Sequence, residues 1–258
     1  MAIDYVVSLD CAPKRALGVE GLVDRIKARS RAEGVIRFAR EHGDSRPVEA
    51  ITFKVGVMGP KGMVEEREAS VSSLLQHSAA LEQHRSTCAS CPANRGKRDG
   101  FGCYDSINYP IRASTEEWLV RRLPPTLACT AGYLFGKALV DFEWDGAQAA
   151  QMRESSRTFF ESEEQLGVDY GDDVVIGSNI VFNMMFHLGH LGASHAKMLC
   201  LFLGVLPHDI DPQAFVGDDW AKHIVPIPPQ EGPEEQMAEF LRACAKSAEL
   251  GVDLFIDA

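Results

Sequence analysis

The chain has 258 residues and a net charge of −11, with 45% hydrophobic and 24% charged residues. These values are ordinary for a globular protein with a buried core. The acidic balance argues against general binding to nucleic acids or to anionic membranes. No apolar run approaches the roughly 20 residues that a membrane span needs. Residues 1–5 lack the basic start of a signal peptide, so we expect a cytoplasmic protein.

The N-terminal half is expected to mix strands and helices. A buried apolar run predicts a strand over residues 3–9, and alternation of apolar and polar residues predicts a second strand over residues 50–58. A helix is expected between them, over residues 19–42. A turn signal rich in glycine and proline follows at 59–62, and a second helix is expected over 63–85.

The rest of the chain is expected to be mostly helical. An irregular stretch covers residues 86–112. The helices expected after it span residues 114–123, 126–143, 146–166, 178–191, 193–205 and 233–250. Residues 252–256 predict a terminal strand that returns to the first two strands. The sequence therefore predicts an α+β fold, with a small sheet from N-terminal and C-terminal strands and a mostly helical second half.

Charge is unevenly distributed along the chain. Residues 1–125 hold 19 Lys and Arg against 16 Asp and Glu, a net of +3. Residues 126–258 hold 7 against 21, a net of −14. The sequence thus suggests an α/β segment over 1–125 and an acidic helical segment over 126–258. The terminal strand would join them into one integrated unit.

Three cysteines lie close together in the irregular stretch. Cys88 and Cys91 are separated by two residues, a spacing that lets a tight turn point both thiolates at one ion. Cys103 follows after a glycine-rich segment. A closed site needs a fourth ligand, for which Cys11, directly after the first strand, is preferred over His84. The pattern predicts a structural metal site.

Three interpretations of this cysteine cluster differ in function. Zinc is the first expectation, because small loops with Cys and His ligands commonly hold it. An iron–sulfur cluster is the alternative and would make the protein a redox enzyme. The third is a non-catalytic module that docks a protein partner through the basic residues of the loop, among them Arg85, Arg95 and Arg112. No other motif identifies a reaction.

A second unusual feature is the uncharged stretch over residues 178–191. At helical spacing Asn179, Asn183, His187 and His190 fall within about 80° of one another, on an otherwise apolar helix. Buried Asn and His side chains need hydrogen-bond partners. They either bond to neighbouring protein groups or line a polar pocket for a small-molecule ligand, and the pocket makes them candidate cofactor-binding residues. A second metal between the two histidines is a further alternative.

Overall fold

The structure, a computed structural model, describes residues 2–58, 64–96, 100–155, 158–171, 174–186 and 189–257. It divides into two compact units: Met1–Leu9 with Gly102–Ala258, here called the sheet unit, and Asp10–Phe101, here called the hairpin unit. The hairpin unit is inserted, in sequence, between the first and second strands of the sheet unit. These limits do not follow the change of charge at residue 125.

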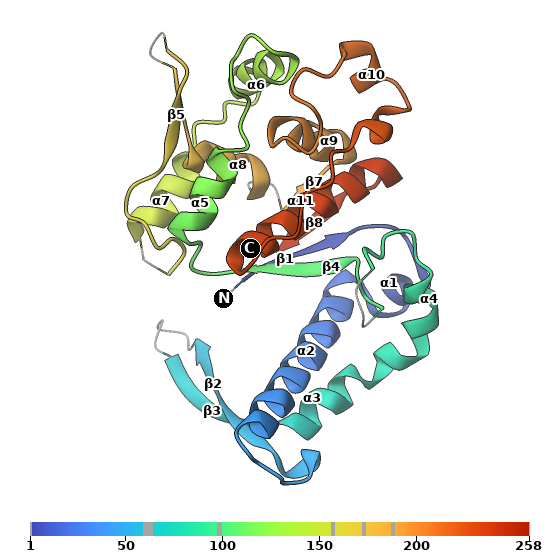
Figure 1. Cartoon of the computed structure of the whole chain (residues 1–258). Coiled ribbons are helices and arrows are strands. Elements are labelled where there is room, and N and C mark those ends of the chain that lie inside the picture. Colours follow the sequence, from blue (N-terminus) through green and yellow to red (C-terminus); the bar gives the residue numbers. More distant parts are fainter. Residues whose placement is uncertain are drawn as a thin grey trace. The chain divides into compact units, whose positions relative to one another are not determined.

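The sheet unit is built on a four-stranded antiparallel sheet of order β4-β1-β8-β7 (Figure 1). Its strands are β1 (Ala2–Val7), β4 (Tyr104–Asn108), β7 (His190–Leu191) and β8 (Leu254–Asp257). The apolar β1 is almost wholly buried and pairs on both sides: Tyr5 lies opposite Asp105 in β4 and opposite Ile256 in β8. The predicted α+β class is confirmed, and the C-terminal strand pairs with the first strand as predicted. The strand predicted over residues 50–58 lies in a separate two-stranded sheet, so the expected return to both strands is wrong for the second.

Helices make up most of the sheet unit. They are α5 (Ala113–Val120), α6 (Thr130–Asp141), α7 (Ala147–Ser155), α8 (Ser178–Phe186), α9 (Ala193–Phe202), α10 (Pro212–Val216) and α11 (Pro233–Leu250). A short hairpin of β5 (Gly167–Asp169) and β6 (Val175–Gly177) lies between α7 and α8 in the chain.

The C-terminal helix α11 covers the sheet. Its buried residues Met237, Phe240, Leu241 and Cys244 recur at helical spacing and form one apolar face. α11 packs against β1, β4 and α9 (Figure 1), and the rings of Phe240 and Tyr5 meet edge to face, 5.1 Å between centroids. The core of this unit therefore lies between α11, its neighbouring helices and the sheet.

The hairpin unit has its own small core. Its elements are α1 (Ala12–Leu17), α2 (Val19–Glu41), β2 (Thr52–Met58), β3 (Val64–Ser70), α3 (Val71–Ser78), α4 (Arg85–Ala89) and 3-10 turns at Val48–Ala50 and Ala79–His84. β2 and β3 form an antiparallel hairpin, and α2 packs against α3. Buried Ala32, Ala39, Ile51 and Val71 form the centre of this core.

Three predicted helices are wrong in extent. Residues 64–70 of the helix expected over 63–85 form β3 instead, because pairing with β2 outweighs the helix propensity of a Glu-rich segment. The helix expected over 146–166 ends at Ser155. The helix expected over 178–191 ends at Phe186 and is followed by β7. Within the described residues, no helix combines the length and apolar character needed to cross a membrane.

Candidate functional site

The cysteines predicted to hold a metal are divided between the two units. Cys11, Cys88 and Cys91 belong to the hairpin unit, whereas Cys103 directly precedes β4 in the sheet unit. Among the described residues, no group of three or more His, Cys, Asp and Glu side chains is placed to hold a metal ion. The metal-binding function predicted from the cysteine spacing is therefore wrong. The described part of the chain holds no set of ligands for either zinc or an iron–sulfur cluster.

An asparagine holds together the loop that was assigned to the metal. Nδ2 of Asn94 donates to the carbonyl oxygens of Cys88 at 3.1 Å and Gly100 at 3.4 Å, while its Oδ1 accepts from the Gly96 amide at 3.1 Å. Cys88 itself lies in α4 with its side chain buried. The Asn94 side chain thus fixes this loop by hydrogen bonds, a role that the cysteine spacing had predicted for a metal ion.

This role of Asn94 predicts a stability difference between two variants. Asn94→Ala removes a donor shared by several carbonyl oxygens, so the free energy of unfolding should fall by about 1–3 kcal/mol. Cys91→Ser should change it by less than about 0.5 kcal/mol. Urea unfolding of both variants measures the difference. Equal losses of stability in the two variants would contradict the main structural role of Asn94 in this loop and would show that Cys91 contributes as much.

The four polar residues of the 178–191 stretch have different surroundings. Asn179 and Asn183 lie on α8 and are both buried. His190 lies in β7 and is exposed, and His187 lies outside the described residues. Because α8 ends at Phe186, the helical spacing used to group the four holds only for the two asparagines.

Asn179 belongs to a buried ion-pair network. The Arg153 guanidinium on α7 binds both carboxylate oxygens of Glu116 on α5, at 2.7 and 3.0 Å, and both side chains are at most 4% exposed. Oδ1 of Asn179 accepts two further hydrogen bonds from Arg153, at 3.0 and 3.2 Å. The Ser178 hydroxyl donates to Glu116 at 2.7 Å. The network ties α5, α7 and α8 together with its charges paired.

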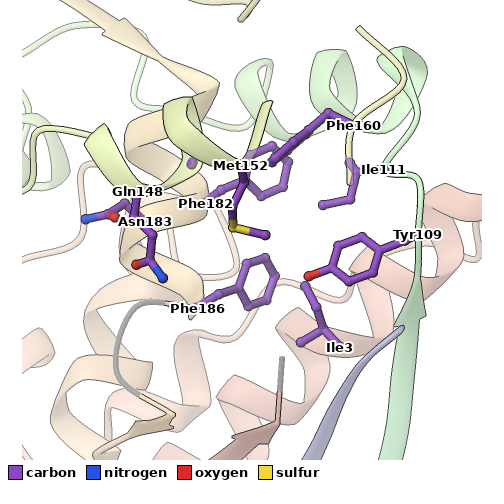
Figure 2. Close-up of a pocket in the computed structure, with 10 residues that line it drawn as sticks. Ile3, Tyr109, Ile111, Gln148, Met152, Phe160, Phe182, Asn183 and Phe186 are labelled. Atoms are coloured by element: carbon purple, nitrogen blue, oxygen red, sulfur yellow. The ribbon is translucent and has the colours of Figure 1, made fainter. Parts of the chain in front are cut away.

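A cavity of about 40 Å³ lies between α7, α8 and the segment after β4 (Figure 2). Most of its described walls are apolar or aromatic, and none of the described residues that line it carries a charge. They are Ile3, Tyr109, Ile111, Gln148, Ala149, Met152, Phe160, Phe182, Asn183 and Phe186. At roughly 10–15 Å³ for each water-sized position, the space takes about three heavy atoms.

Asn183 is the polar group of this cavity whose bonding is incomplete. Its side chain is 7% exposed, and its Oδ1 has no hydrogen-bond partner among the described residues. A buried acceptor left without a partner costs about 1–3 kcal/mol. Figure 2 shows Gln148 beside it, so two side-chain amides stand together at one side of the cavity. Across from them, burial raises the pKa of Tyr109 to about 12, which keeps its hydroxyl neutral.

His195 is a further polar side chain that contacts α8. Its ring stacks on Trp144 with centroids 5.0 Å apart and bonds to the Met184 backbone. Burial lowers the pKa of His195, and burial likewise lowers the pKa of His208. Both imidazoles are therefore held in the neutral form at neutral pH, and neither lines the cavity.

These two histidines predict a loss of stability in mild acid. Because their pKa values are lower in the folded chain than the ~6.5 of an unfolded chain, the unfolded state binds protons first as the pH falls. The stabilisation should be complete above about pH 6.5 and decrease below it. Denaturant unfolding between pH 7.5 and 5 should show a shallower decrease for His195→Phe, which keeps the stack on Trp144. An identical decrease in the variant and the natural chain would contradict the assignment.

Similarity to known proteins gives no information about this site. No known protein family, no curated protein and no solved structure matches the chain. The function of the site is therefore inferred from the geometry of the cavity and its lining residues. The described part of the lining has apolar walls, no charged side chain and one amide oxygen without a partner, so it can bind and orient a small molecule. Asn183 is the residue of this lining for which the sequence predicts a ligand contact. The aromatic walls come from three separate chain segments, which no local spacing connects.

Proposed function

We propose that the protein binds a small, uncharged molecule in the cavity beside Asn183. The observation that carries the proposal is the Oδ1 of Asn183, nine-tenths buried at the cavity and without a partner in the described chain. Buried polar atoms are nearly always hydrogen-bonded, so an unpaired one beside a space indicates a place for a bound group.

The composition of the walls supports an apolar body for the ligand. The Met152 thioether and the Phe182 and Phe160 rings surround the middle of the cavity (Figure 2). A net charge on the ligand would meet no opposite charge among those lining residues that the structure describes, so its desolvation would go uncompensated there. An apolar group of about three carbons gains roughly 0.8 kcal/mol per carbon, or about 2.4 kcal/mol in all, so small probes should bind with dissociation constants of about 20 mM.

Methyl NMR of methionine tests the proposal at the cavity itself. With ¹³C-labelled methionine methyl groups, the Met152 signal, assigned through Met152→Leu, should move on titration with a short-chain probe such as butyramide. The buried Met237, on α11 and absent from the cavity walls, should stay in place. No movement of the Met152 signal at 100 mM probe would contradict a binding cavity.

A matched pair of alanine variants separates the cavity from the surface of α7. Ala149 lines the cavity and is buried, whereas its neighbour Ala150 does not line it. Ala149→Val adds two methyl groups where the ligand would lie and should abolish the Met152 response. Ala150→Val should keep it. Equal responses in both variants would place the binding outside the cavity.

A cytoplasmic location is part of the same proposal. Cys200 and Cys244 form no disulfide and have no exposed surface, and burial raises the pKa of Cys200 to about 12. Buried thiols of this kind suit a reducing compartment. Oxidant treatment of the folded protein should leave both thiols unmodified, as mass spectrometry after alkylation in denaturant would show.

A further inference from the structure

We infer that the ligand carries a carboxamide, or an equivalent neutral group with a donor and an acceptor side by side, on a short apolar chain. The inference rests on the proposed binding function and names the ligand class for the same cavity. Three features support it: the amide groups at the polar side of the cavity, the apolar groups at the other side, and the volume between them.

The polar side of the cavity is formed by two amides. Asn183 is buried and lacks a partner for its Oδ1 in the described chain, and Gln148 is exposed beside it at the cavity edge (Figure 2). A side-chain amide offers a donor and an acceptor in one plane. A ligand amide offers the same two groups, so it can donate to Oδ1 of Asn183 and accept from Nδ2 of the same side chain. A ketone brings only an acceptor and leaves Oδ1 of Asn183 unpaired.

Charged head groups fit this side poorly. A carboxylate would set a negative charge against the Asn183 carbonyl oxygen, and the described lining residues hold no cation to pair with it. An ammonium can donate to Oδ1, but it loses hydration without gaining an anion. The phenol of Tyr109, whose pKa burial raises to about 12, adds a neutral hydroxyl and no charge. A neutral amide is the head group that meets Asn183 without such a penalty.

The apolar side limits the chain of the ligand. About 40 Å³ takes roughly three heavy atoms. Met152 and the rings of Phe160 and Phe182 border that space. The three-carbon propyl chain of butyramide takes up this room, so the amide lies at the cavity edge, on the side of Asn183 and Gln148.

Four probes with nearly the same shape test the inference on the full chain: butyramide, 2-pentanone, butyrate and butylammonium. Their dissociation constants come from the titration of the Met152 methyl signal at pH 7.5. Butyramide should bind about tenfold tighter than each of the others, because it gains about two neutral hydrogen bonds. In Asn183→Leu the affinity for butyramide should fall about tenfold and that for 2-pentanone should change less than about threefold. Gln148→Ala, at an exposed position, should weaken butyramide selectively and covers the case in which Asn183→Leu fails to fold.

The outcomes separate the ligand class from the cavity. Equal affinities for butyramide and 2-pentanone, unchanged in Asn183→Leu and Gln148→Ala, would overturn the carboxamide inference and keep the proposed binding function. Tightest binding of butyrate or butylammonium would overturn it as well. Failure of all four probes to move the Met152 signal would remove the binding function, and the inference with it.

Discussion

Replacing Arg153 by Met should lower the free energy of unfolding by about 3–5 kcal/mol, the largest single-residue effect expected in this chain. The substitution keeps much of the side-chain volume but leaves the Glu116 carboxylate, which is 0% exposed, without its partner. It also removes the donor for Asn179 and the guanidinium that lies 4.1 Å from the Phe160 ring centroid. Chemical denaturation followed by circular dichroism measures the loss.

A neighbouring ion pair supplies the control for Arg153. Glu117 and Arg121 pair within α5 and its C-terminal end, but both side chains are more than half exposed. Arg121→Met should cost less than about 1 kcal/mol, because exposed pairs contribute little. In the double variant Glu116→Leu with Arg153→Met, stability should recover most of the loss, since no buried charge remains unpaired. A double variant as unstable as Arg153→Met alone would show that the cost comes from packing and not from charge.

The two asparagines of α8 should respond in opposite directions to the same substitution. Asn183→Leu removes a buried acceptor that has no partner in the described chain, so it should raise the free energy of unfolding by about 1 kcal/mol. Asn179→Leu removes the acceptor of two hydrogen bonds from Arg153 and should lower it by about 1.5–3 kcal/mol. The residues are one helical turn apart, so each variant is the matched control for the other.

A gain of stability at Asn183 is the result expected of a site kept for binding. Groups that bind ligands are often unsatisfied in the empty protein, and their replacement stabilises the fold while function is lost. If Asn183→Leu instead destabilises the chain as strongly as Asn179→Leu, Asn183 makes structural hydrogen bonds. The argument for a ligand at its Oδ1 would then be lost.

The sequence predicts the strands and helices whose patterns are local. β1 is a buried apolar run and α11 has a clear apolar face, so both are recognisable from the sequence alone, and the terminal strand β8 returns to β1 as expected. The segment 64–70 is different, because its Glu-rich composition favours a helix whereas its pairing with β2 depends on a partner strand. Local pattern is therefore sufficient where tertiary pairing does not oppose it.

The candidate site was accessible to sequence reasoning only in part. An uncharged apolar stretch with polar residues indicated buried polar groups, and Asn179 and Asn183 are indeed buried. Their different roles depend on residues far away in sequence. Arg153 satisfies the first, while the cavity walls around the second come from β1, from residues 109–111 after β4, from α7 and α8, and from Phe160. The cysteine spacing gave a wrong prediction because a CxxC pair is equally compatible with a turn that contains no metal. Here the Asn94 side chain stabilises that turn.

The most direct test of ligand binding in the cavity is an intermolecular nuclear Overhauser measurement on the protein saturated with butyramide. The ligand methyl group should show contacts with the Met152 methyl and with the Phe182 ring, and these contacts should disappear in Ala149→Val but persist in Ala150→Val. Contacts confined to surface residues, or none at saturating butyramide, would contradict the account that this cavity binds a small uncharged molecule.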